Sequence, residues 1–184
     1  MISNKQLGQV GETAVALELL KKGFDVININ CTYTNYQKAD LICMNPTNGN
    51  CVMVQVKTGT TKNILTGFVS ELNGTIPYIE ESIIGPWVFV KTDKDDLSKF
   101  EFYILTREEI IELITTSNKW YVTEWNRKLQ KKPIVGVDIS WLKGEGIKAT
   151  ESHMKIQHGE YKNPLGHNSL NRWDKIEKLL ADKK

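Results

Sequence analysis

The sequence predicts a mixed α/β domain in which helices cover a small central sheet. A helical stretch opens the chain at residues 4–22, because Ser3 can cap it and Gly23 can end it. Two apolar runs of strand length follow, joined by a tight turn, and further strand-like runs come before and after a second helix. This alternation of helix and strand indicates helices packed on a mixed sheet.

Strands are expected where short runs are rich in β-branched and aromatic residues. Such runs occupy residues 24–30, 39–45, 51–57, 87–91, 101–105 and 134–139. The turn PTNGN makes residues 39–57 a hairpin, since Pro46 and Gly49 favour turn geometry. Residues 58–86 carry few signals, and we expect loop with short elements there.

Two later helices are expected. Thr106 and Glu109 form a capping box ahead of an apolar stripe that begins at Ile110, so one helix should end near Asn118. Asn168 or Ser169 should cap a last helix. Its apolar stripe comprises Leu170, Trp173, Ile176 and Leu180, and the lysines outside the stripe are Lys175, Lys178, Lys183 and Lys184. Residues 143–168 are expected to form loop or an extended arm.

Charge is unevenly distributed along the 184 residues, a length that fits one domain with appendages. Residues 1–118 hold 10 Lys and Arg against 14 Asp and Glu, whereas residues 119–184 hold 14 against 8. We therefore divide the chain into a core, residues 1–118, and a basic C-terminal extension, residues 119–184, packed on that core. A basic surface is typical of nucleic-acid contact, and also of helices that are merely solvated.

Composition bears on compartment and on metal content. No apolar run approaches the ~20 residues of a membrane span, and the first residues lack the pattern of a signal peptide, so we expect a cytoplasmic protein. Cys31, Cys43 and Cys51 are odd in number and have no CxxC spacing. We expect small, buried, reduced side chains and no structural zinc.

A carboxylate, an amide and an ammonium should meet at one end of the hairpin. Asp40 begins one strand, and Gln55 and Lys57 share a face near the end of the other. Such oxygen ligands suit Mg²⁺, and a neighbouring lysine can orient water or stabilise charge on a phosphate. Each residue alone is more often ordinary turn or surface chemistry. Their joint placement favours a site that hydrolyses phosphodiesters.

Glu12 adds a second acid from the first helix. It lies in a stripe of small and apolar residues that includes Gly8, Val15 and Leu19. An acid in such a place needs a partner or a metal. We expect a metal ligand or a supporting residue, and the alternative is a salt bridge, for example to Lys57.

Three strings in order, GETAVALELLKKGFDVIN, KADLICM and VMVQVKTGT, resemble the PD-(D/E)XK endonuclease superfamily. The likeness covers residues 5–60 and is strongest to members with QxK in place of ExK, such as some restriction, homing-endonuclease and resolvase-like enzymes. It implies a restriction-endonuclease-like αβββαβ core, with Mg²⁺ or Mn²⁺ as the cofactor.

The resemblance implies a role for each matching residue. Asp40 would be the metal-binding acid, Gln55 would take the second ligand position, and the backbone carbonyl of Val56 would be a further ligand. Lys57 would be the catalytic lysine, and Glu12 matches the helix glutamate of resolvase-like members. Gln55 departs from the commoner Asp or Glu, and because an amide carries no charge, metal affinity should be lower.

Contacts with nucleic acid are expected in two places. Thr58 follows the lysine, as a hydroxyl residue often does in this group, and can bond a phosphate oxygen. Residues 119–133 combine aromatic side chains for stacking with cations for phosphates, namely Trp120, Tyr121, Trp125, Arg127, Lys128, Lys131 and Lys132. The alternative is that the tryptophans pack under the sheet and the lysines form a solvated face.

These observations lead us to expect a metal-dependent DNA endonuclease. A catalytically inactive nuclease fold that binds nucleic acid stays open, because Gln55 is neutral and the C-terminal third is basic. A protein-interaction role is a third possibility, for which the long segments 58–86 and 143–168 offer room. Cutting both strands of a duplex would favour a homodimer.

Overall fold

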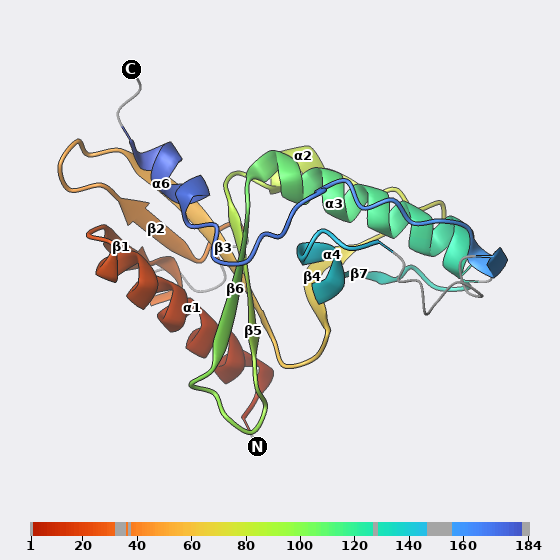
Figure 1. Cartoon of the computed structure of the whole chain (residues 1–184), viewed down its shortest axis with the longest axis horizontal. Coiled ribbons are helices and arrows are strands. Elements are labelled where there is room, and N and C mark those ends of the chain that lie inside the picture. Colours follow the sequence, from red (N-terminus) through yellow and green to blue (C-terminus); the bar gives the residue numbers. More distant parts are fainter. Residues whose placement is uncertain (1, 32–35, 37, 127–128, 147–155, 182–184) are drawn as a thin grey trace.

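The computed structural model describes residues 2–31, 36, 38–126, 129–146 and 156–181. Within them, five strands form one mixed sheet in the order β1-β2-β3-β5-β6, and two strands, β4 and β7, form a second. The strands are β1 Asp25–Asn28, β2 Leu41–Met44, β3 Cys51–Gly59, β4 Asn63–Val69, β5 Trp87–Thr92, β6 Phe100–Leu105 and β7 Ile134–Asp138. The predicted mixed α/β class is confirmed (Figure 1).

The main sheet begins as an antiparallel meander of β1, β2 and β3. The predicted hairpin is confirmed, with Leu41 opposite Val54 and Met44 opposite Cys51. β5 then pairs with β3 in parallel, and β6 pairs with β5 antiparallel. A parallel return needs a crossover, which β4 and the short helix α2 (Ile79–Ser82) supply.

The strand β4 was not identified, since residues 58–86 were expected to be loop with short elements. Its buried and exposed residues do alternate, but Gly67, with a φ of 92°, interrupts the run, and the register with its partner shifts there. The partner strand β7 lies about seventy residues further along the chain. A pairing over that separation leaves no local signal.

Capping fixes both long helices. Ser3 and Gln6 form the capping box of α1 (Asn4–Lys21), and Thr106 and Glu109 form that of α3 (Arg107–Trp120). The predicted helices are therefore confirmed, although α3 continues past Asn118 to Trp120. It then widens into the π-helical turn η2, Tyr121–Trp125.

Two hydrophobic clusters lie on opposite faces of the sheet. Alternation along β5 sends Val88 and Val90 to a cluster with α1 and α6 (Asp174–Leu180), and sends Trp87 and Phe89 to a cluster with α3, β4 and β7. Figure 1 shows the same division, with α1 and α6 on one side of β5 and β6, and α3, α4 (Ile139–Leu142) and β7 on the other.

The extension, residues 119–184, supplies elements to both clusters. β7 pairs with β4, and Trp173, Ile176 and Leu180 of the C-terminal segment are buried beside α1. The boundary drawn after residue 118 falls within α3. The division into core and extension stays a prediction.

The last helix begins later than expected. Asn168 accepts a hydrogen bond from the backbone N–H of Leu170 at 2.9 Å, which makes a local turn, and helix α6 starts only at Asp174. Leu170 lies outside the helix and bridges to Tyr103 of β6. The stripe residues Trp173, Ile176 and Leu180 are buried as expected.

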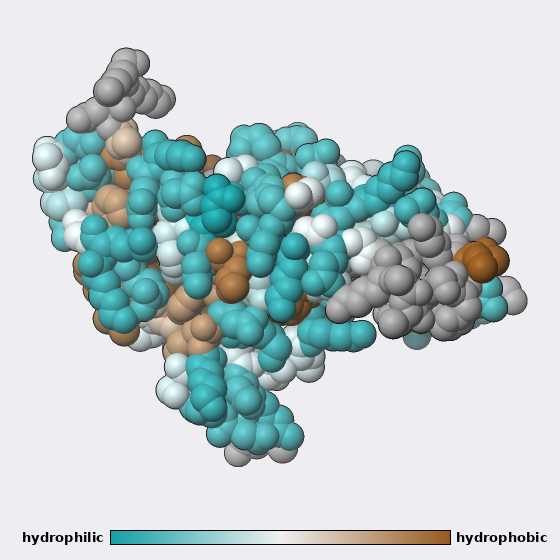
Figure 2. All heavy atoms as spheres, in the orientation of Figure 1, coloured by the Kyte–Doolittle hydropathy of each residue, from teal (hydrophilic) through white to brown (hydrophobic). Residues whose placement is uncertain are grey.

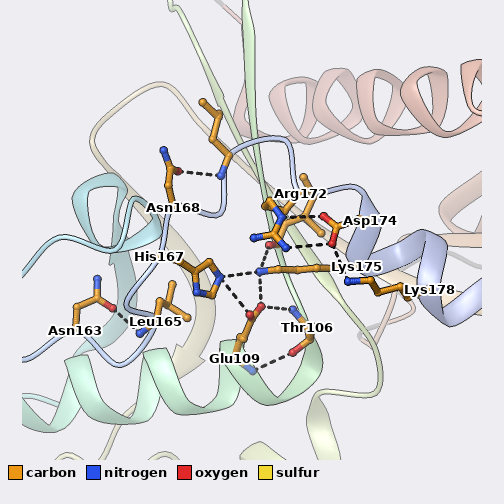
Figure 3. Close-up of polar contacts among 12 residues, drawn as sticks. Thr106, Glu109, Asn163, Leu165, His167, Asn168, Arg172, Asp174, Lys175 and Lys178 are labelled. Atoms are coloured by element: carbon orange, nitrogen blue, oxygen red, sulfur yellow. Dashed lines mark hydrogen bonds and ion pairs between the residues drawn. The ribbon is translucent and has the colours of Figure 1, made fainter.

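Lys175, which was expected outside the apolar stripe, is nevertheless buried. Its side chain is 6% exposed, and its ammonium donates to Glu109 Oε2 at 2.6 Å and to the carbonyl of Ile104 at 3.0 Å. His167 Nε2 lies 3.2 Å from the same ammonium and 3.3 Å from Glu109 Oε1 (Figure 3). Lys175 thus ties α6 to the first turn of α3. Lys183 and Lys184 lie outside the described residues.

The far end of α6 is held by the hairpin turn. The amide groups of Asn45 and Asn48 donate to the carbonyl of Leu180 at 3.1 and 3.0 Å, and that of Asn50 donates to the carbonyl of Ala181 at 3.0 Å. A helix C-terminus leaves such carbonyls without intrahelical partners. The hairpin that bears the candidate site residues therefore also caps the last helix.

Helix α1 lies unusually close to β3 at Gly11. A Cβ built on Gly11 would stand 2.9 Å from both Cβ and Cγ2 of Thr58, and closer still to the hydroxyl. Gly8, one turn earlier on the same helix, has nothing within 4 Å of such a Cβ. The close approach at Gly11 sets the height of its neighbour, Glu12, above the sheet.

Hydrophilic residues predominate on the face that Figure 2 shows. None of the described helices is long and apolar enough to cross a bilayer. The two cysteines whose side chains are described differ in exposure. Cys43 is buried as expected, whereas Cys51 is exposed at the start of β3, which corrects its expected burial. The side chain of Cys31 lies outside the described part of the chain.

Gly11→Ala should lower the free energy of unfolding by about 1–3 kcal/mol, because the added methyl group collides with a strand residue. Gly8→Ala is the matched control and should raise it by up to about 1 kcal/mol through helix propensity alone. Urea denaturation followed by circular dichroism measures both. Equal gains at the two positions would contradict the close approach.

Lys175→Ala should lower the free energy of unfolding by roughly 3–5 kcal/mol, because it leaves the carboxylate of Glu109 without the lysine that pairs with it. Lys178→Ala removes a cation paired with Asp174 on the exposed side of the same helix and should change stability little. Thermal melts of both variants provide the comparison. Similar losses would mean that the position within α6, and not the buried pair, decides the effect.

Candidate active site

Asp40 is the centre of the polar cluster. It directly precedes β2, and its backbone is held on both sides, by Ile29 N–H at 2.9 Å and through its own N–H to Val54 O at 3.0 Å. The residue is 8% exposed, and its carboxylate accepts hydrogen bonds from the backbone N–H of Val56 at 2.7 Å and from Gln55 Nε2. The strand pairing of the hairpin therefore fixes this acid.

Glu12 reaches the same cluster from α1. Asn28 of β1 donates to Glu12 Oε2 at 3.0 Å. Asn30 donates from one amide nitrogen to Glu12 Oε1 at 3.2 Å and to Asp40 Oδ1 at 3.0 Å. One N–H donor group thus joins two carboxylates that lie 28 residues apart in the sequence.

Burial changes the acidity of Glu12. Desolvation raises its pKa, the hydrogen bonds from Asn28 and Asn30 lower it, and the charge of Asp40 raises it further. The net direction is upward. The surroundings of Glu12 therefore destabilise its charged form.

Lys57 lies on β3 two residues after Gln55, with its ammonium 5.4 Å from the ring centroid of Trp87. Burial lowers the pKa of this ammonium, while the charges of Asp40 and Glu12 oppose that shift. Trp87 is buried and stacks on Phe68 at 5.9 Å, so the ring below the ammonium is itself held in place. A cation over an indole face is a favourable arrangement.

The donor set fits a hard divalent cation. Carboxylate oxygens of Glu12 and Asp40 converge on the amide of Asn30, and the amide of Gln55 contacts the carboxylate of Asp40. Carboxylate and amide oxygens are the ligands that Mg²⁺ prefers. The amide N–H groups of Asn30 lie where a cation would contact both carboxylates. Among the described residues no three His, Cys, Asp or Glu side chains gather as a metal site, so the neutral Gln55 would have to complete the set.

Thr58 packs away from this point. Its hydroxyl is buried against Gly11 of α1 and has no hydrogen-bond partner among the described residues. A hydroxyl shielded in this way is closed to a phosphate. We therefore do not include Thr58 among the proposed nucleic-acid contacts, and its role is to receive the close approach of the helix.

The basic and aromatic stretch, residues 119–133, lies apart from the acids, at the end of α3 (Figure 1). Trp120 and Trp125 pack on each other at 5.4 Å and do not lie under the main sheet. Lys131 is exposed, and Lys132 pairs with Glu71 at 2.6 Å. Arg127 and Lys128 fall outside the described residues.

Sequence reasoning missed Asn28, Asn30 and Trp87. A signal for the asparagines existed, because polar residues at alternate positions of the apolar run FDVININ share one face of the chain. No signal identified Trp87, whose position beneath Lys57 depends on the parallel pairing of β3 with β5. That pairing joins strands about thirty residues apart.

Lys57→Met should raise the free energy of unfolding at pH 7, because it removes a partly buried ammonium whose pKa is lowered. The sign follows from linkage: the cost of holding the charged form is present below the folded pKa, and vanishes above the unfolded lysine value of about 10.4. The advantage of the variant should therefore shrink as pH rises from 7 towards 10.5. Urea denaturation of both proteins across this range tests it, and a pH-independent difference would contradict it.

Comparison with known proteins gives limited likeness. No family model and no curated protein matches the chain. Among solved structures, the bacterial homing endonuclease I-Ssp6803I is 19% identical with a TM-score of 0.39, over 60% of this chain and 70% of that one. Hjc, a Holliday junction resolvase of the archaeal hyperthermophile Archaeoglobus fulgidus, is 12% identical with a TM-score of 0.38, over 72% and 84%. These values are low, and the function proposed below rests on the residues of the site.

Proposed function

We propose that this protein is an endonuclease that hydrolyses phosphodiester bonds in DNA with the help of Mg²⁺ or Mn²⁺. The observation that carries the proposal is the single amide of Asn30 that joins the carboxylates of Glu12 and Asp40, next to the desolvated ammonium of Lys57. Two acids brought together against their mutual repulsion, with a lysine beside them, suit the binding of a metal and a phosphate.

Asp40, Glu12 and Gln55 would hold the ion, with the carbonyl of Val56 as a further ligand. A bound divalent cation lowers the pKa of water and neutralises charge on the phosphate. The N–H of Val56 fixes the position of Asp40, and a bound ion would take the place of the Asn30 and Gln55 amides on its carboxylate. Gln55 would turn its amide so that the oxygen, and not the nitrogen, faces the ion.

Lys57 would act on the water or on the phosphate. Its lowered pKa increases the fraction of Lys57 that is a neutral amine near neutral pH, and a neutral amine can take a proton from water. In its charged form it stabilises negative charge that develops on the phosphate oxygens. Trp87 keeps the amine at one position in either case.

A second candidate, a nucleic-acid-binding module without catalysis, is favoured by one observation. Asn30 and Gln55 donate hydrogen bonds to the two carboxylates, so neutral amides satisfy these acceptors. Such a closed network is stable without an ion. The two candidates differ in whether a divalent cation displaces these amides.

Cleavage of supercoiled plasmid in Mg²⁺, in Mn²⁺ and in EDTA tests the proposal. The parent protein should nick or linearise the plasmid only with metal, and linear product would support action as a homodimer. Lys57→Ala should slow cleavage by about 10²–10⁴-fold, the usual contribution of a proton-transfer group. Asp40→Asn should abolish metal-dependent cleavage.

Matched controls are available on the surface. Lys5→Ala and Asp95→Asn remove an exposed cation and an exposed acid far along the chain from the hairpin, and both should cleave at the parent rate. Cleavage by Lys57→Ala at the parent rate would refute the site assignment.

Mn²⁺ binding separates the two candidate functions without reference to turnover. Titration followed by electron paramagnetic resonance should show one bound ion per chain, and Asp40→Asn should weaken it by at least about tenfold. Bound Mn²⁺ without cleavage would indicate a demanding substrate. DNA binding that falls steeply with salt, with neither bound Mn²⁺ nor cleavage, would support the binding module.

A further inference from the structure

A hollow lies between the end of α3 and helix α4. Its volume is about 410 Å³, within the range of small-ligand sites. Four of its lining residues are aromatic, namely Trp120, Tyr121, Trp125 and Trp141. Two lysines, Lys62 and Lys143, and two acids, Asp138 and Glu145, also line it. None of them belongs to the proposed metal site.

The π-helical turn shapes the aromatic wall. The N–H of Asn126 donates to the carbonyl of Tyr121 at 2.8 Å, five residues back, which widens the helix at this point. In a regular α-helix the neighbours on one face are three and four residues apart. The wider turn instead brings Trp120 and Trp125 together, with ring centroids 5.4 Å apart. Such turns occur frequently at functional sites.

Further rings brace this wall. Tyr161 is buried and lies 5.5 Å from Trp120 and 4.9 Å from Trp141, so one ring connects the two sides of the hollow. His158 lies 4.7 Å from Trp125 on the same chain segment. An aromatic surface held in this way is preorganised for a flat ligand.

One polar atom of the wall lacks a partner. The indole N–H of Trp120 is buried and has no acceptor among the described residues. A buried donor without an acceptor is costly and uncommon in folded proteins. Trp120 is therefore held by its ring contacts with Trp125 and Tyr161, and not by a hydrogen bond among the described residues.

We propose that this hollow receives an unpaired nucleobase of the DNA strand that the protein cuts, an inference that rests on the proposed function. A base has a flat π face that can stack on the tryptophans, and the phosphates of its strand carry negative charge that Lys62 and Lys143 can neutralise.

The hollow lies within reach of the proposed metal site. Lys62 follows Lys57 by five residues, so their Cα atoms are separated by at most about 18 Å. Stacked nucleotides advance 3.4 Å each along a strand, which makes this span about five nucleotides. The substrate class that follows is DNA with unpaired nucleotides close to the cut, such as a fork or flap, in preference to a continuous duplex.

Binding in EDTA, where cleavage is absent, tests the inference by fluorescence anisotropy with three labelled probes. One is a fork whose arm carries five unpaired thymidines, the second has an arm of five abasic sites with the same phosphates, and the third is a fully paired duplex. The parent should bind the thymidine fork most tightly. Trp125→Ala should weaken that binding by about 5- to 150-fold, the usual effect of losing one stacked base.

Controls separate stacking from charge and from damage to the fold. Trp125→Ala should bind the abasic fork and the duplex within about twofold of the parent, since it removes no cation, and Trp125→Phe should retain most of the thymidine preference. Tyr78→Ala removes an aromatic ring that is 79% exposed and outside the hollow, and it should bind all three probes like the parent. If Trp125→Ala melts below the assay temperature, Tyr121→Ala serves the same comparison.

The outcomes are distinct. Equal binding of the thymidine and abasic forks by the parent, or an unchanged thymidine preference in both Trp125→Ala and Tyr121→Ala, would overturn the inference. A lack of metal-dependent cleavage would refute the endonuclease proposal alone. Base-dependent binding lost in Trp125→Ala would then still assign the hollow.

Discussion

The polar cluster depends on how closely helix α1 lies on strand β3. Only a glycine at position 11 lets the helix descend until it rests on Thr58, and this contact brings the next residue, Glu12, to the level of the strand ends. A wider gap would leave Glu12 above the sheet, out of reach of the Asn30 amide. Position, and not only residue type, makes Glu12 and Asp40 a pair.

Much of this half of the molecule is encoded locally. Capping residues, the apolar stripe of α3 and the turn of the hairpin predict their elements directly, and placing Asp40 opposite Gln55 needs only a count outward from Pro46. The same count cannot show that Asn30 joins the two acids, because that depends on the pairing of β1 with β2 and on the height of α1.

The elements that were missed share one property, since their partners are remote. Strand β4 is stabilised by β7, and the segment before α6 bridges to β6 instead of continuing the helix. Lys175 is buried because it pairs with Glu109 in the first turn of α3. A lysine beside a helical stripe normally stays in solvent. Its burial depends on a carboxylate and a carbonyl from elements far away in the sequence. No local sequence pattern predicts these contacts.

The capping of α6 by the asparagines of the hairpin turn has a consequence for the order in which the protein takes shape. The hairpin comes early in synthesis, yet the carbonyls that occupy Asn45, Asn48 and Asn50 belong to residues 180 and 181. While the ribosome is still extending the chain, the turn lacks those partners, and the apolar face of β2 and β3 lacks the cover of Trp173 and Ile176. Contacts of such long sequence separation form late and slow the folding of a domain. The nascent chain would therefore emerge with the hairpin turn incomplete until residues 180 and 181 have been made and have packed against it.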